Sequence, residues 1–273
     1  MNTWDSLEPK PGPYKLSVIS IFRILIRLPI IILIICSGSI IFSGIRIIEF
    51  PLIGQNRVIS GYVTRIVCGL CLYVLGIRVE IIGIPMKHKG PIVSNHVSWL
   101  DVFVLNSVEK VYFVAKSEVA RWPLIGWLAR MTGALFIKRK KSDSLNQIKE
   151  FEERLLKGQR LLFFPEGTST DGLQILHFKP TLFEALFRDK LKNLLWVQPV
   201  TLNYLVPSSL DGRFYAWWGD MSFATHFLLV LSTKKGGKVS VTIHDPIKIS
   251  LYNGRKELAY ACYEIIDLSL KVE

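Results

Sequence analysis

One strand-to-helix junction, Pro91-Ile-Val-Ser-Asn-His-Val-Ser-Trp-Leu-Asp101, sets the pattern for most of this chain. Its first four residues form a short, largely apolar run that is typical of a buried strand. Ser98 and Asp101 stand three positions apart, which is the spacing of a capping box at the start of a helix. The junction therefore predicts a strand that passes directly into a helix, as in an α/β fold.

The same alternation continues along the chain from about residue 77. Several of the expected strands are unbroken apolar runs, which is typical of strands covered on both faces. We expect strands at Arg78–Ile82, Pro91–Ser94, Val111–Ala115, Ala134–Ile137, Leu161–Phe164, Leu195–Leu202 and Lys238–Ile243. We expect helices at Trp99–Ser107, Ser117–Arg130, Ser142–Lys157, Thr181–Lys190 and Arg255–Leu270. The pattern predicts an α/β fold with a mixed, mostly parallel sheet covered by helices.

Three regions of the chain differ in composition. Residues 1–15 are polar and contain three prolines, which predicts a flexible tail. Residues 16–76 are strongly apolar and are interrupted near Pro51 and Gly54, so we expect a helical membrane-binding segment made of two helices. Residues 77–273 carry the strand–helix alternation and the residues suited to chemistry, so we expect them to form a catalytic domain.

The most apolar stretch runs from Leu28 to Ile45 and is about 18 residues long, the lower limit for crossing a bilayer. Pro29 and Gly38 weaken it as a straight span. Basic residues flank it on both sides, so the charges give no orientation. A true span and a re-entrant or interfacial segment with both ends in the cytosol fit the sequence equally well.

Composition narrows the possible partners. The 273 residues include 34 Lys and Arg against 22 Asp and Glu, a net charge of +12, and half of them are hydrophobic. This excess suits a membrane surface or nucleic acid, but the cations flank apolar segments, which favours the membrane. Cys68 and Cys71 lie in an apolar run, so we expect buried thiols. The sequence has no metal, nucleotide or serine-hydrolase motif, so we predict neither a metal nor a cofactor.

His96 and Asp101 are the residues of the first junction that could do chemistry. A chain that enters a helix at Ser98 folds back over the first turn, so the imidazole and the carboxylate can meet. The carboxylate would fix the tautomer of the ring and leave its other nitrogen free to act as a base. On spacing alone the plainer interpretation is favoured, in which Asp101 only caps the helix and His96 is a polar loop residue.

Two further strands end in polar or charged groups. One passes into Pro-Glu-Gly-Thr, where Glu166, Gly167 and Thr168 form a turn whose amides and hydroxyl can bind an anion. Another ends in Lys138 and Arg139, and the guanidinium of Arg139 can hold a phosphate. Taken singly, an ordinary turn and a solvated basic loop explain these two runs without any function.

In combination and in this order, the runs resemble the glycerolipid acyltransferase family. The blocks of that family are Asn-His-x4-Asp, a Phe-Ile-x-Arg-like strand end, Phe-Pro-Glu-Gly-Thr-Arg-Ser and an apolar strand with a proline. Here they read Asn95-His96 to Asp101, Phe136-Ile-Lys-Arg139, Phe164-Pro-Glu-Gly-Thr168 and Val197-Gln-Pro-Val200. The resemblance covers about residues 78–245 and extends to a helical membrane-binding leader.

This resemblance implies transfer of a fatty acyl group from a thioester, acyl-CoA or acyl carrier protein, to the free hydroxyl of a lysolipid. It implies that His96 is the general base and Asp101 its partner, and that attack is direct, without a cofactor. It also implies a place at the inner, cytoplasmic membrane with the active site on the cytoplasmic side. The residues expected to position the acceptor are Lys138, Arg139, Glu166, Gly167 and Thr168.

One position departs from the family pattern, because the arginine after Phe-Pro-Glu-Gly-Thr is Ser169 here. We expect the acceptor to be 1-acylglycerol 3-phosphate, giving phosphatidic acid, since it is the commoner substrate of the family. The alternative is the lyso-ornithine lipid O-acyltransferase branch, whose acceptor carries an amino acid. The stretch 168–172 with the following Phe178-Lys179, and the stretch 215–221, are similar to that branch. A non-catalytic membrane-surface binding protein is the alternative from another class, but it leaves His96 and Asp101 unexplained.

Overall fold

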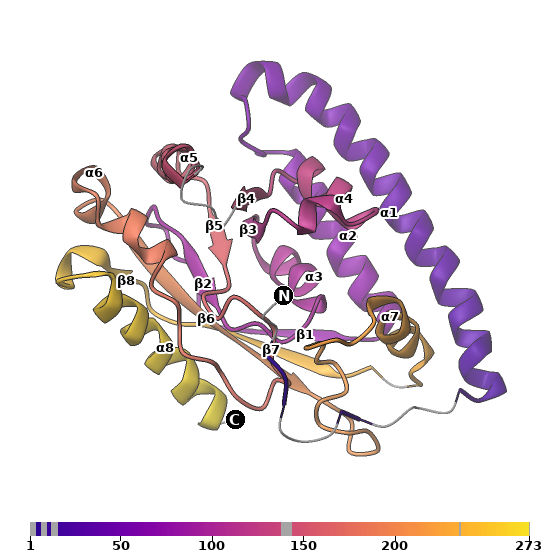
Figure 1. Ribbon diagram of the computed structural model, residues 1–273. Helices are drawn as coiled ribbons and strands as arrows, with labels where there is room; N and C mark the ends of the chain where they lie inside the picture. Colours follow the sequence, from indigo (N-terminus) through magenta and orange to yellow (C-terminus); the bar gives the residue numbers. More distant parts are fainter. Residues whose placement is uncertain (1–3, 7–9, 12–15, 138–143, 235, 273) are drawn as a thin grey trace.

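The computed structural model describes residues 4–6, 10–11, 16–137, 144–234 and 236–272. Within these ranges an eight-stranded sheet carries helices on both faces (Figure 1). The strand order is β1-β7-β6-β2-β5-β3-β4, and β8 pairs with β6 beside that path. Neighbouring strands run parallel, except that β6 is antiparallel to β7 and to β8. The mixed, mostly parallel sheet confirms the predicted fold class.

The seven strands expected from the sequence are present, with some ends shifted by a few residues. They are β1 (Arg78–Ile82), β2 (Ile92–Ser94), β3 (Tyr112–Lys116), β4 (Leu135–Ile137), β5 (Leu161–Phe163), β6 (Trp196–Leu205) and β7 (Lys238–Ile243). The short strand β8 (Ile247–Lys248) was not expected, because two residues are too few to produce an alternating pattern.

The helices agree less closely with the sequence. Those observed are α1 (Val18–Ile53), α2 (Ser60–Leu75), α3 (Leu100–Val108), α4 (Ile125–Met131), α5 (Ser144–Leu156), α6 (Asp189–Lys192), α7 (Phe223–Ser232) and α8 (Arg255–Val272). Short 3₁₀ helices lie at Val119–Arg121, Leu182–Phe187 and Ile249–Leu251.

The expectation of one helix over Ser117–Arg130 is wrong. The chain breaks at Pro123 and at Leu124, whose φ is +60°, so a 3₁₀ turn and α4 take its place. The expected helix Thr181–Lys190 is likewise a 3₁₀ helix followed by α6. Helix α7 was missed, because its nearly continuous apolar run shows no clear helical period.

The sheet has an apolar core on each face. Helices α1, α2, α3 and α7 cover one face, and α5, α6 and α8 cover the other (Figure 1). Along β2, Ile92 points into the first core and Val93 into the second. Residues of β5 alternate in the same way, with Leu162 in the first core and Phe163 in the second. These strands are therefore covered on both faces, as their unbroken apolar runs predicted.

Helices α1 and α2 form a hairpin that is joined to the domain along its length. Where the hairpin turns, the buried carboxylate of Glu49 accepts hydrogen bonds from the hydroxyl of Ser60 and the amide of Ile59. At the other end, Arg23 and Arg27 donate to the backbone carbonyls of residues 231–233 at the end of α7, with distances of 2.8–3.1 Å. Because α2 also packs on α3, the hairpin and the sheet form one packed unit.

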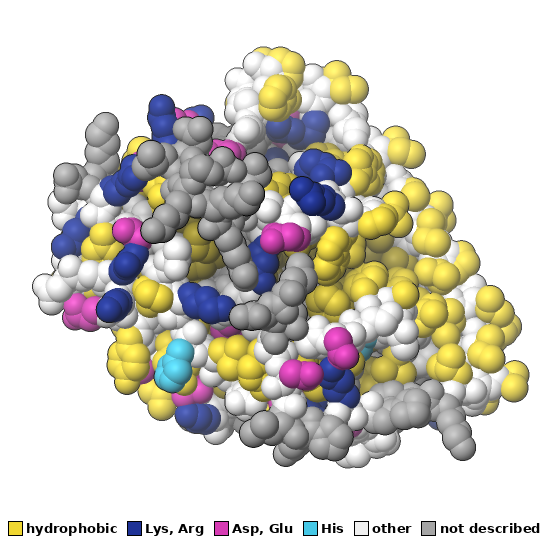
Figure 2. Space-filling model, in the orientation of Figure 1, with side chains coloured by type: hydrophobic (Ala, Val, Ile, Leu, Met, Phe, Trp, Pro, Cys, Tyr) yellow, Lys and Arg dark blue, Asp and Glu magenta, His cyan; other side chains and the backbone are white. Residues whose placement is uncertain are grey.

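The outer side of α1 is apolar and exposed. By length and composition the helix could cross a membrane, with a mean hydropathy of 2.6 over its best window, of which only 6% is buried. Leu33, Ile40 and Ile47 are each more than two-thirds exposed. Figure 2 shows hydrophobic side chains gathered along the flank where α1 runs in Figure 1. A flank of this size and composition suits contact with lipid.

Replacing Gly38 with Ala should destabilise the hairpin, because this glycine of α1 faces Val67 of α2 with no room for a Cβ. A Cβ at position 38 would lie 2.2 Å from Cγ2 of Val67 on α2. We expect Gly38→Ala to cost ~1–3 kcal/mol of stability by overpacking and to lower the midpoint of thermal unfolding.

Gly44→Ala is the matched control, because a Cβ there would meet nothing within 4 Å. Alanine is the better helix former by about 0.5–1 kcal/mol, so this midpoint should stay or rise. Circular dichroism of both variants in one detergent checks the prediction, and equal midpoints would contradict it.

Candidate active site

His96 lies in the loop between β2 and α3 and Asp101 lies in the first turn of α3, at the carboxyl end of a strand flanked by β5 and β6. Ligands of α/β sheets bind at this edge. The imidazole Nδ1 of His96 lies 2.8 Å from Oδ2 of Asp101. Asp101 is fully buried, whereas the side chain of His96 is 21% exposed. The structure thus brings together the two side chains that the sequence placed five positions apart.

Asp101 also binds the backbone that leads into α3. Its Oδ2 accepts the amides of Val97 at 2.8 Å and of Ser98 at 3.0 Å. This is half of the predicted capping box, since the buried hydroxyl of Ser98 has no partner within the described residues. An ionised carboxylate only accepts hydrogen bonds, so the ring proton sits on Nδ1 and Nε2 carries the lone pair that could take up a proton.

The ring of His96 is stacked on an aromatic side chain from the end of β5. The centroids of His96 and Phe164 are 4.1 Å apart and their planes differ by 12°. Phe164 stacks in turn on Phe113 of β3, with centroids 6.0 Å apart. Stacking and the bond to Asp101 together fix the plane of the imidazole, so Nε2 points in one direction.

Glu166 lies behind the loop that carries His96. It is buried, and burial raises the pKa of its carboxyl to about 8. One oxygen accepts the amide of His96 at 2.7 Å and the other accepts the amide of Leu176 at 2.8 Å. Both carboxyl oxygens are therefore bonded to backbone amides, and Glu166 joins the His96 loop to the segment that follows the Pro-Glu-Gly turn.

Other backbone bonds complete this support. The amide of Thr170 donates to the carbonyl of His96, and the amide of Trp217 donates to the carbonyl of Val97, both at 2.9 Å. Ser169, at the position of the family's arginine, is buried, and its hydroxyl donates to the carbonyl of Trp217. The stretch 215–221 is therefore part of the site, packed directly against the His96 loop.

A lysine from further along the chain, Lys179, lies against the turn that follows β5. Gly167 has a φ of +71°, and a Cβ on it would lie 3.0 Å from Nζ of Lys179. The ammonium group of Lys179 therefore lies over the turn, a placement that sequence reasoning did not predict. Thr168 follows Gly167 and is partly exposed. Lys138 and Arg139, the other residues expected to position the acceptor, lie outside the described residues.

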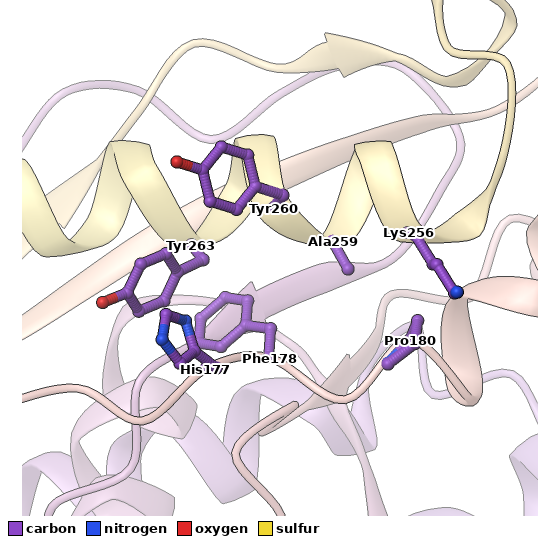
Figure 3. A pocket seen from close by; sticks show the side chains of 7 residues that line it. All are labelled: His177, Phe178, Pro180, Lys256, Ala259, Tyr260 and Tyr263. Atoms are coloured by element: carbon purple, nitrogen blue, oxygen red, sulfur yellow. The ribbon is translucent and has the colours of Figure 1, made fainter.

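A cavity of about 220 Å³ opens between α8 and the segment that follows Leu176 (Figure 3). Its wall is joined to the site, because the amide of Leu176 binds Glu166. Neither His96 nor Asp101 lines it, so the cavity is separate from the histidine–aspartate pair. The lining residues are His177, Phe178, Pro180, Lys256, Ala259, Tyr260 and Tyr263.

Comparison with known proteins places this geometry in a family. Residues 77–202, which hold the histidine–aspartate pair and the Pro-Glu-Gly turn, match the family described as Acyltransferase. A lyso-ornithine lipid O-acyltransferase from Rhodobacter capsulatus is 46% identical over 240 residues, or 88% of this chain and 87% of that protein. The chain belongs to the acyltransferase family. It is an O-acyltransferase of lysolipids, a class of membrane-lipid enzymes, and its long apolar helix agrees with association with a membrane.

Two further relatives add to this result. A 1-acyl-sn-glycerol-3-phosphate acyltransferase from Neisseria gonorrhoeae is 38% identical over 103 residues, or 37% of this acyltransferase and 40% of that protein. The crystal structure of the 1-acyl-sn-glycerophosphate (LPA) acyltransferase PlsC from Thermotoga maritima matches with a TM-score of 0.65 at 20% identity. That match covers 93% of this chain and 97% of the other, so the two proteins share their fold.

Replacing Glu166 with Gln should change how stability depends on pH. The folded enzyme keeps a proton on Glu166 up to a pKa of about 8, whereas the ordinary pKa is 4.5. The folded state binds more protons than the unfolded state between these values, so the wild type loses stability as pH rises through this range. The loss is at most ~1.4 kcal/mol per pH unit and ends above the higher pKa.

Gln at this position cannot titrate. The two proteins can differ in thermal unfolding midpoint at about pH 5. As the pH rises to about 8, the midpoint of Glu166→Gln minus that of the wild type should increase. Differential scanning fluorimetry across this range measures it. A constant offset between the two proteins would mean that Glu166 is ionised in the folded enzyme throughout.

Proposed function

We propose that this acyltransferase acylates the free hydroxyl of a lyso-ornithine lipid, with His96 as the general base. The observation that carries the proposal is the 46% identity, over 88% of the chain, to a protein named for that activity. The relative named for 1-acylglycerol 3-phosphate matches over a much shorter stretch. The sequence motifs alone ranked 1-acylglycerol 3-phosphate first, and the comparisons favour the alternative.

The site around Ser169 supports this choice of acceptor. Where the family pattern has an arginine suited to a phosphate, Ser169 has a buried side chain whose hydroxyl donates to the carbonyl of Trp217. An acceptor with an amino acid as head group has no phosphate, so it does not need the paired hydrogen bonds that an arginine guanidinium donates to one. Its carboxylate can pair with a single ammonium group, and Lys179 offers one over the turn at Gly167.

The proposed reaction moves one proton through His96. Nε2 takes the proton of the lipid hydroxyl while the oxygen attacks the thioester carbonyl, and Asp101 stabilises the imidazolium that forms. The tetrahedral intermediate then breaks the carbon–sulfur bond, and the imidazolium returns the proton to the leaving thiolate. An ester and a free thiol result, and the enzyme is regenerated. Either acyl-CoA or acyl carrier protein can supply the thioester.

Direct attack by the lipid hydroxyl is favoured because the thiols of the core are unsuited to an acyl-enzyme. Cys68, Cys71 and Cys262 are buried. Burial raises the pKa of Cys262 far above its usual range, which leaves the thiol protonated and a weak nucleophile. The base and the lipid hydroxyl are therefore sufficient for the chemistry.

We further propose that α1 and α2 rest in the cytoplasmic leaflet of the inner membrane and do not span it. Helix α1 has 36 residues, roughly 54 Å at 1.5 Å per residue, far longer than a hydrocarbon core of about 30 Å. Arg23 and Arg27 near its start bind the end of α7, and α2 after it packs on α3. The start of α1 and the helix that follows its end are thus both bound to the catalytic domain. Leu124 and Trp127 of the α4 region are also exposed apolar side chains.

Sidedness tests the membrane proposal. Ser6→Cys precedes α1 and Asn253→Cys lies in the loop before α8, and both should react with a membrane-impermeant maleimide in inverted vesicles and remain unlabelled in right-side-out vesicles. A spanning α1 would give opposite patterns for the two positions. Cys36 is the exposed native cysteine and should be replaced by Ser in both variants.

His96→Ala tests the enzyme activity directly. We expect kcat to fall by about 10²–10⁴-fold, the usual contribution of a positioned base, with membrane attachment unchanged. His88→Ala is the matched control, since His88 is exposed and its ring stacks on Trp196, with centroids 4.4 Å apart. Equal activity of the two variants would reject His96 as the base.

The acceptor is tested by offering purified enzyme lyso-ornithine lipid and lysophosphatidate in the same micelles with one labelled thioester. We expect kcat/KM for lyso-ornithine lipid to exceed that for lysophosphatidate by roughly tenfold or more, because Ser169 at the position of the family's arginine gives the phosphate one charged partner fewer. The reverse preference would restore 1-acylglycerol 3-phosphate as the substrate.

A further inference from the structure

The second oxygen of Asp101 has a partner that the histidine–aspartate chemistry does not require. Oδ2 is shared by the imidazole of His96 and the amides of Val97 and Ser98. Oδ1 accepts a hydrogen bond from the hydroxyl of Tyr204, at 2.7 Å. Since Asp101 is fully buried, Tyr204 supplies the bond that this oxygen would otherwise lack.

Tyr204 reaches Asp101 because of the order of the strands. It stands near the end of β6, which pairs in parallel with β2, so both strands deliver their carboxyl ends to the same edge of the sheet. Val200, Leu202 and Tyr204 alternate along β6 and point into the core that α3 covers. The hydroxyl therefore reaches the first turn of α3 from the sheet and binds the carboxylate oxygen that the imidazole does not use.

The surroundings of Tyr204 hold its hydroxyl in place as a donor. Its ring packs with Val97 and Trp218 and lies 6.0 Å from the ring of Tyr215. Burial and the neighbouring carboxylate of Asp101 raise the pKa of the Tyr204 hydroxyl well above its usual range. The hydroxyl thus keeps its proton, and Asp101 is the acceptor of that proton's hydrogen bond.

The geometry points to Tyr204 as a positioning residue of this acyltransferase, which fixes the carboxylate plane of Asp101 and through it the direction of Nε2 on His96. A carboxylate can turn about its last side-chain bond unless both oxygens are held. Without the tyrosine hydroxyl, Asp101 can tilt, and the single oxygen that serves His96 and two amides loses its fixed direction. This role rests on the proposed function of His96 as the base.

Tyr204→Phe removes the hydroxyl and keeps the ring. We expect kcat to fall by about tenfold or more and KM for the acceptor to stay within about twofold, because misdirecting a base affects the transition state and not the bound lipid. Tyr112→Phe is the control, since Tyr112 is also a buried strand tyrosine, but its hydroxyl accepts the amide of Arg57 and donates to the carbonyl of Gln55 at the turn of the hairpin. Its kcat should stay near that of the wild type.

A double-mutant cycle identifies the route of the effect. In the Asp101→Asn background, Tyr204→Phe should cost less than about twofold more, since residues that act as a unit are not additive. If the loss of kcat in the double variant equals the product of the losses in the two single variants, the proposal is overturned. A raised KM for the acceptor at unchanged kcat in Tyr204→Phe would overturn it too. An unaltered kcat in Tyr204→Phe while His96→Ala is inactive would defeat this inference alone, whereas an active His96→Ala would defeat the proposed function.

If Tyr204→Phe does not fold, 3-fluorotyrosine at position 204 provides the second measurement. It keeps the shape of the side chain and makes the hydroxyl a stronger donor, so kcat should shift by about twofold or more, as expected where a hydrogen bond orients a catalytic group. The same replacement at position 112 should leave kcat unchanged. Equal rates at both positions would overturn the role of Tyr204.

Discussion

The buried carboxylate of Asp101 is the constraint around which the site is built. A carboxylate taken out of water is costly unless donors replace the water, and here the donors are an imidazole, two loop amides and a tyrosine hydroxyl. The loop between β2 and α3 must therefore point its amides toward this carboxylate. The same loop conformation brings the ring of His96 to the same oxygen. Glu166 repeats this arrangement on the other side, where its carboxyl holds the amide of His96 itself. The imidazole is oriented by groups on both sides of one loop.

Much of this arrangement could be predicted because it is local. The strand-to-helix junction and its capping spacing allowed His96 to meet Asp101, and the resemblance to the family turned this possibility into an expectation. Short β-rich runs, several of them unbroken and apolar, predicted seven of the eight strands described. The hydroxyl of Tyr204 could not be foreseen, since it meets Asp101 across 103 positions and a tyrosine in a strand resembles any core aromatic. The ammonium of Lys179 over Gly167 depends in the same way on how a loop returns. The break at Pro123 was visible in the sequence, and the helical period around it was given too much weight.

The acceptor that we propose rests on similarity that extends beyond the shared motif blocks. In the reaction that we propose, the histidine and the aspartate serve proton transfer, which is the same for any lysolipid hydroxyl. Ser169 stands at the arginine position of the third block and bonds to Trp217, which lies in a stretch that the blocks do not include. Short motifs therefore identify the reaction, and similarity along most of the chain bears on the substrate.

The bonds from Arg23 and Arg27 to the end of α7 hold the apolar hairpin to the same packed unit that carries His96. If the hairpin lies in a leaflet, as we propose, the imidazole travels at a constant height above the lipid surface as the enzyme diffuses sideways. The search for a substrate then becomes two-dimensional, and encounter depends on lateral density and not on the trace of lysolipid dissolved in water. A hydroxyl buried too deep or held too far out in the head-group layer would pass the base without reacting.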